Sequence, residues 1–182
     1  MMSNLDIILD EAFSLYNVGQ IEQAENLTRQ VLNAEPNHGD ALFLLGLIAF
    51  QSGALEPASD LLFQAVKLYP HIENYTLTLA SILQKQGRLD EALTYYEKFP
   101  DNPAGLAQRG FIYLLKKQKD FAKSAFKKSL ELMPSLAEAR LGQALVEEDI
   151  KSLKKTAEET NLPDAWYYFA KYHREKGSLK RP

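Results

Sequence analysis

Apolar and polar residues follow one another along the chain in the pattern of paired helices, and the clearest pair lies between Gly39 and Pro70. The segment from Ala41 to Phe50 has no polar side chain, and Gln51-Ser52-Gly53 then interrupts it. Apolar residues recur at helical spacing from Ala58 to Leu68. A helix that is apolar on every face needs protein on several sides. The pattern therefore predicts a helix, a turn and a second helix, with the first helix central to the core.

The same pattern recurs with a period of 34 residues. Glycines stand at the predicted turns, small residues at one point of each second helix, and prolines after its end. These positions are Gly19, Gly53 and Gly87, then Ala24, Ala58 and Ala92, then Pro36 and Pro70. A fixed period of this length predicts an all-α stack of helix pairs, because one pair alone cannot bury its apolar faces.

The period shortens once and then resumes. Pro100 follows Pro70 by 30 residues, whereas Pro134 follows Pro100 by 34. Four residues are about one helical turn, so we expect a shortened second helix in the third pair. The predicted pairs span about 5–38, 39–72, 73–102, 103–136 and 137–162, and a partial pair or cap spans 163–182, all within one domain. The fifth pair has Glu147-Glu148-Asp149 at its turn with no glycine, and a short second helix is predicted at 150–160.

The residues of the central pair resemble those of a tetratricopeptide repeat. They are Leu42, Leu45, Gly46 and Ala49 on the first helix, Ala58, Leu62 and Ala65 on the second, and the closing Pro70. In this pattern the small residues lie where the two helices cross, and larger residues fill the spaces between repeats. The resemblance implies a right-handed superhelical solenoid of about five and a half repeats.

The resemblance also implies a concave groove lined by the first helix of each repeat. Its expected binding residues are Phe13, Tyr16, Phe43, Leu47, Phe50, Leu77, Phe111 and Leu114, in register with Leu9, Ser81, Gln84 and Ala107. These residues are mostly apolar, whereas family members that hold a peptide carboxylate use Lys and Asn here. We expect an interaction scaffold or adaptor, chaperone-like in its groove chemistry, that binds an apolar peptide or helix of a protein partner or of a second copy. The alternative interpretation is that these side chains are core residues of a tightly wound stack.

Two other functions fit the sequence. The segment Glu35 to Leu42 is similar to repeat arrays that precede bacterial glycosyltransferase or sulfotransferase domains, so the chain could be the N-terminal targeting array of a larger enzyme. Alternatively, a lysine cluster could contact nucleic acid or an acidic protein. It consists of Lys116, Lys117, Lys119, Lys123, Lys127 and Lys128. Nucleic acid is the less favoured partner, because the cluster has no arginine or interleaved aromatic residue.

Charge divides the chain into an acidic and a basic half. Residues 1–100 have 5 Lys and Arg against 13 Asp and Glu, a net charge of −8, whereas residues 101–182 have 16 against 11, a net charge of +5. A solvated outer face is the plainest explanation for the lysines.

Catalytic and metal-binding patterns are absent from the sequence. There is no cysteine, and the three histidines, His38, His71 and His173, are not accompanied by ligands at metal-binding spacing. No phosphate-binding loop, His-Glu-x-x-His or nucleophile motif occurs. We therefore predict no enzyme activity, no cofactor and no metal. The N-terminus does not resemble a signal peptide and no apolar run is long enough for a membrane span, which predicts a cytoplasmic protein.

Overall fold

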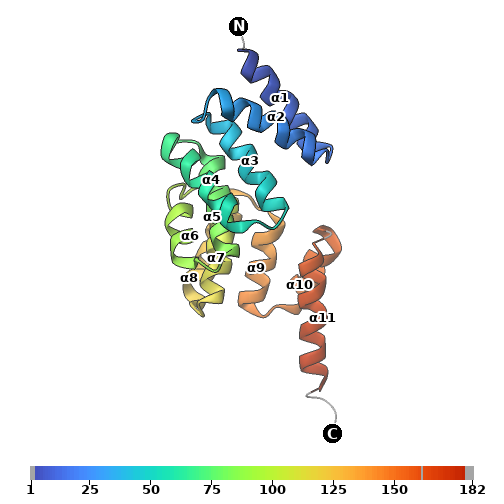
Figure 1. Cartoon of the computed structure of the whole chain (residues 1–182). Coiled ribbons are helices and arrows are strands. Elements are labelled where there is room, and N and C mark those ends of the chain that lie inside the picture. Colours follow the sequence, from blue (N-terminus) through green and yellow to red (C-terminus); the bar gives the residue numbers. More distant parts are fainter. Residues whose placement is uncertain (1–2, 161, 179–182) are drawn as a thin grey trace. The chain divides into compact units, whose positions relative to one another are not determined.

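A computed structural model describes residues 3–160 and 162–178 of the chain. These residues form eleven α-helices and no strand (Figure 1). The helices are α1 (Asn4–Asn17), α2 (Ile21–Ala34), α3 (Gly39–Gln51), α4 (Leu55–Leu68), α5 (Glu73–Lys85), α6 (Leu89–Tyr96), α7 (Pro103–Leu115), α8 (Lys119–Leu132), α9 (Ala137–Glu147), α10 (Ile150–Thr160) and α11 (Pro163–Ser178). The all-α class predicted from the 34-residue period is confirmed.

Successive helices pack in pairs, α1 with α2, α3 with α4, α5 with α6, and α7 with α8. The shortened period appears as a short helix, since α6 has 8 residues whereas α2, α4 and α8 have 14 each. In the last part α10 packs on both α9 and α11. The chain divides into two compact units, an N-terminal unit (Met1–Lys98) and a C-terminal unit (Phe99–Pro182). A single domain over all 182 residues stays a prediction.

Helix α3 is the centre of the N-terminal unit, as its uniformly apolar sequence predicts. Helices α1, α2 and α4 all pack against it. Its residues Leu44 and Ile48 share a buried cluster with Leu9, Ala24 and Val31 of the first pair. One partner could not cover all faces of α3, and the structure surrounds it with several helices, including α5 through the Phe43–Tyr75 contact.

Glycines allow the helices to approach closely where they cross. A Cβ at Gly46 would lie within van der Waals overlap of Leu62 on α4. In the C-terminal unit the ring of Phe126 lies against two glycines, Gly110 of α7 and Gly142 of α9. The prediction that Gly46 makes room at the crossing of its own pair is therefore confirmed, and Phe126 uses the same device towards two helices.

The turn within each pair contains one residue in the left-handed region of backbone conformation. Glycine occupies it in the first three pairs, with φ of +80° at Gly19, +82° at Gly53 and +78° at Gly87. Lys117 (φ +59°) and Glu148 (φ +55°) occupy it in the fourth and fifth pairs. The fifth pair thus keeps the turn geometry without the glycine, and its second helix α10 is short, as expected, with 11 residues.

Candidate binding surfaces of the repeat array

The side chains predicted to form the groove lie on first helices at three positions that recur from repeat to repeat. The first position is held by Leu9, Phe43, Leu77 and Ala107, the second by Phe13, Leu47, Ser81 and Phe111, and the third by Tyr16, Phe50, Gln84 and Leu114. The structure separates these positions by exposure. All residues of the second and third positions are half-buried, whereas three of the four at the first position are buried.

Phe43 is a correction to the predicted groove. It is only 5% exposed, and its ring stacks on Tyr75 of α5 with the centroids 5.0 Å apart and the planes at 24°. Phe43 therefore joins two neighbouring repeats and has little surface left for a partner. The interpretation of these side chains as core residues holds for this position, together with Leu9 at 4% exposure.

The remaining apolar side chains of the N-terminal unit keep part of their surface accessible. Phe13 and Tyr16 of α1 pack against the cluster of Leu44 and Ile48 but are not covered by it. The ring of Phe50 has the Lys85 ammonium 5.7 Å from its centroid. We name the half-buried set Phe13, Tyr16, Leu47, Phe50 and Leu77 the first-helix groove.

Phe111 and Leu114 belong to the C-terminal unit. The ring of Phe111 meets Phe126 edge to face, with centroids 5.1 Å apart, and Leu114 packs against the same cluster. Both are half-buried, as at the equivalent positions of the N-terminal unit. A continuous eight-residue groove across both units stays a prediction.

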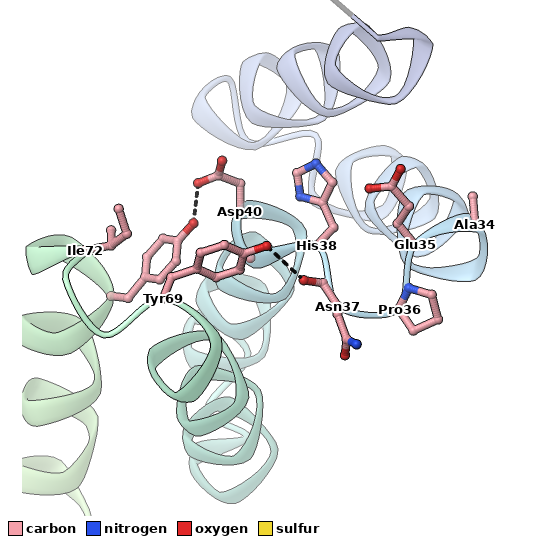
Figure 2. Close-up of a pocket in the computed structure, with 10 residues that line it drawn as sticks. Ala34, Glu35, Pro36, Asn37, His38, Asp40, Tyr69 and Ile72 are labelled. Carbon is pink, nitrogen blue, oxygen red and sulfur yellow. Dashed lines mark hydrogen bonds between the residues drawn. The ribbon is translucent and has the colours of Figure 1, made fainter.

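A concave surface that was not predicted from the sequence lies at the turns between repeats (Figure 2). It is a pocket of about 730 Å³ where the α2–α3 and α4–α5 connections meet. We call it the turn pocket. Its lining residues are Ala34, Glu35, Pro36, Asn37, His38, Gly39, Asp40, Tyr69, Ile72 and Tyr75.

Two tyrosines and a glycine shape the turn pocket. The Tyr75 hydroxyl donates a 2.5 Å hydrogen bond to Asp40 Oδ1, and the Tyr69 hydroxyl donates a 3.4 Å bond to the Asn37 carbonyl (Figure 2). Burial, followed by the bond to Asp40, raises the pKa of Tyr75, so its phenol stays protonated. The Tyr69 ring lies on Gly39, where a Cβ would be 2.5 Å from the ring carbons. The tyrosines are thus held in place by backbone and carboxylate contacts.

His38 is the residue immediately before α3, and an acidic side chain of α1 lies near it. Its Nε2 is 3.9 Å from Asp6 Oδ1 of α1, and its Nδ1 is buried without a hydrogen-bond partner in the structure. Hydrogen bonds from the backbone and side chain of Ser3 lower the pKa of Asp6, which therefore stays ionised. His38 occupies the N-cap position of α3, and its side chain is only 16% exposed.

The lysine cluster of the C-terminal unit is largely neutralised by acidic side chains. Lys119 and Lys123 lie 3.2 and 3.9 Å from the carboxylates of Glu148 and Glu147, and Lys128 lies 2.9 Å from Asp101. The positive charge is therefore interleaved with negative charge, which weakens its attraction for a polyanion.

Metal and membrane sites are not found in the part of the chain that the structure describes. Within residues 3–160 and 162–178, no group of three or more His, Asp or Glu side chains is arranged to hold a metal ion. Nor is any helix of these residues both long and apolar enough to cross a bilayer. The side chain of His173 lies outside the described residues.

Comparison with known proteins gives the family. Residues 17–99 match the family model described as anaphase-promoting complex, cyclosome, subunit 3. The TPR repeat-containing protein MJ1428 of Methanocaldococcus jannaschii is 31% identical over 129 residues, which are 68% of this chain and 23% of that protein. The chain spans about a quarter of the length of the curated relatives it matches.

Solved structures agree on the fold. A tetratricopeptide repeat protein from Parabacteroides merdae matches 95% of this chain and 73% of its own, with a TM-score of 0.79 and 20% identity. YrrB, described as a TPR protein with an unusual peptide-binding site, matches 90% of both chains with a TM-score of 0.70 and 18% identity. The 34-residue period, the helix pairs and these similarities show that the chain belongs to the tetratricopeptide repeat proteins.

Proposed function

We propose that the protein is a non-enzymatic scaffold whose first-helix groove binds an apolar helical or extended segment of another protein. Repeat arrays of this kind present extended surfaces to protein partners. The observation that carries the proposal is the exposure pattern. At the second and third groove positions of the N-terminal unit, Phe13, Tyr16, Leu47 and Phe50 stay half-exposed although buried positions lie one turn away.

The expected affinity follows from the area that remains accessible. If the five side chains of the groove leave roughly 200 Å² for contact and the peptide buries a similar area, the gross gain is roughly 10 kcal/mol at about 25 cal/mol per Å². Association and side-chain ordering cost at least about 4 to 5 kcal/mol. The dissociation constant is therefore about 100 µM or weaker. Because Phe43 is buried and adds little contact surface, we expect weak, reversible binding.

Two double substitutions of matched composition test the groove. Leu47→Ser with Phe50→Ser removes two groove side chains, whereas Leu61→Ser with Phe63→Ser removes the same two residue types from α4, outside it. The probe is a fluorescein-labelled 14-residue amphipathic peptide of Leu and Gln, followed by fluorescence anisotropy. We expect the groove variant to weaken binding at least tenfold while the α4 variant binds as the wild type does. Equal losses in both variants would contradict the proposal, provided circular dichroism shows both folded.

A second candidate function is that the chain is the repeat array of a longer protein. The observation in its favour is that the chain spans only about a quarter of its curated relatives. The array would then recruit a partner for a domain elsewhere in the protein, such as a glycosyltransferase or sulfotransferase. Sequencing the reading frame beyond Pro182 tests for such a domain downstream of the array, which an immediate stop codon would exclude.

A further inference from the structure

We propose that the turn pocket receives a cationic side chain, Arg or Lys, of a partner polypeptide. This site is separate from the first-helix groove, because it lies at the connections between repeats and shares no residue with the groove. The inference does not depend on what the groove binds.

Formal charge around the pocket is negative. Glu35 and Asp40 line it, and Asp6 lies beside His38 at its edge. The pocket-lining residues, all within the described part of the chain, include no Lys or Arg. Figure 2 shows the side chains of Glu35, His38 and Asp40 on the same side of the turn, with His38 between the two carboxylates. The N-terminal unit as a whole has a net charge of −8, so long-range attraction favours the same sign of ligand.

The opposing field of helix α3 is too small to reverse this preference. Its N-terminus at Gly39 faces the pocket and contributes about half a positive elementary charge. Glu35 and Asp40 contribute two full negative charges. Asp40 also lies in the first turn of α3, so the dipole balances part of its charge. The N-terminus of α5, capped by Ile72, adds about another half positive charge, and the net charge around the pocket is still negative.

The chemistry of the walls favours an organic cation over a metal ion. The acidic and histidine side chains here do not form a metal-binding group within the described residues. The Tyr69 ring is 37% exposed and lies edge to face against Tyr75, with centroids 6.4 Å apart. Aromatic surface beside carboxylates suits a guanidinium or ammonium group, which gains from both. The Tyr75 hydroxyl donates to Asp40 Oδ1 and so orients the carboxylate. The other oxygen, Oδ2, is the one that would accept a hydrogen bond from the cation.

Two charge-neutralising variants with equal loss of charge isolate the pocket. Glu35→Gln with Asp40→Asn removes both pocket carboxylates and keeps an oxygen acceptor for Tyr75. Glu11→Gln with Glu22→Gln removes two exposed carboxylates of the same unit outside the pocket. The probes are the acetylated peptides Gly-Ser-Gly-Arg-Gly-Ser and its citrulline analogue, titrated into the ¹⁵N-labelled full chain at pH 7.5.

We expect the arginine peptide to shift the amide signals of Gly39, Asp40 and Tyr69, with a dissociation constant on the order of a few millimolar. The pocket variant should weaken this binding at least fivefold, the control variant less than twofold, and the citrulline peptide should leave the signals in place. Equal weakening in both variants, or equal binding of citrulline, would overturn the proposal. If the double variant unfolds, Glu35→Gln alone, at an exposed turn residue, should still weaken binding about twofold, and no change there would also count against it. The groove variant Leu47→Ser with Phe50→Ser should bind the arginine peptide normally, which separates this test from that of the groove.

Discussion

At the residue scale, Lys117 and Glu148 occupy left-handed turn positions at which the first three helix pairs have glycine. Both have positive φ, at +59° and +55°, where a Cβ crowds the following carbonyl. The equivalent turns of the first three pairs use glycine. The fourth and fifth turns therefore store strain that the earlier ones avoid.

Replacing either residue with glycine should stabilise the protein. The change removes left-handed strain of about 1 to 2 kcal/mol and adds about 0.5 to 1 kcal/mol of unfolded-state entropy, so the net gain is about 0.5 to 1 kcal/mol for each site. Urea unfolding followed by circular dichroism measures it. Gln118→Gly is the matched control, since Gln118 has φ of −96° in the same turn and glycine brings no relief of strain there. A loss of stability in Lys117→Gly would contradict this account.

The sequence could predict the glycine turns but not these two exceptions. A 34-residue glycine period is visible in the letters, whereas Lys117 and Glu148 reveal their conformation only once the flanking helices are in place. The same holds for Phe43 and His38. The 34-residue period places Phe43 on the first helix of its repeat, but only the position of Tyr75 in the next repeat shows that the Phe43 ring is covered. His38 is on a turn, yet α1 brings Asp6 beside it.

At the element scale, a single side chain caps the start of α10, as Ser3 does for α1 and Asn102 does for α7. Asp149 Oδ1 accepts hydrogen bonds from the backbone amides of Lys151 (2.9 Å) and Ser152 (3.3 Å), and its Oδ2 accepts one from Ser152 Oγ (2.6 Å). The Ser152 side-chain bond is the main reason that the pKa of Asp149 is lowered from its usual value. The short helix α10 therefore begins at a charged cap.

Acid should weaken this cap. A lowered pKa in the folded state means that ionised Asp149 adds stability at any pH above its unfolded pKa, about 3.9, and that this contribution is lost as pH falls through the folded value. Asp149→Asn should therefore be less stable than the wild type at pH 7, and the difference in urea midpoint should shrink by pH 2.5. Asp60→Asn, in the middle of α4, serves as the control. A difference that is constant with pH would show that the charge of Asp149 does not matter.

Close packing where helices cross also limits which residues the chain can have, and the contacts of Phe126 show this limit. A Cβ on Gly142 of α9 would lie only 2.1 Å from the Phe126 ring, and one on Gly110 of α7 would lie 2.5 Å from it. Phe126 is fully buried, so the ring cannot move aside into solvent. Three helices, α7, α8 and α9, are thus packed around one side chain.

Gly142→Ala should destabilise the protein by about 1 to 3 kcal/mol through overpacking, even though alanine favours a helix by about 1 kcal/mol. Phe126→Leu in the Gly142→Ala background should recover part of the loss, because the smaller side chain leaves room for the new methyl group. A double-mutant cycle in urea measures this coupling. Additive effects of the two changes would mean that the ring and the glycine do not constrain each other.

At the scale of the whole molecule, the repeat count and the charge differ between the two units. The N-terminal unit contains three complete helix pairs, whereas the C-terminal unit contains α7 to α11, which is two and a half. The repeat period predicted the pairs but not the division of the chain after Lys98. The acidic and basic halves of the sequence coincide with these units, since Phe99 and Pro100 carry no charge.

Three repeats are about the minimum for a stable stack, because each pair buries its apolar face only against a neighbour. We therefore expect a fragment of residues 1–98 to fold alone with a cooperative thermal transition, and a fragment of residues 99–182 to melt at a lower temperature or without cooperativity. The net charge of −8 repels itself within the first fragment, so raising the salt concentration from 20 to about 300 mM, which shortens the screening length to less than 10 Å, should raise its Tm. Circular dichroism melts of both fragments check this. A first fragment that stays unfolded at both salt concentrations would show that its three pairs need the rest of the array.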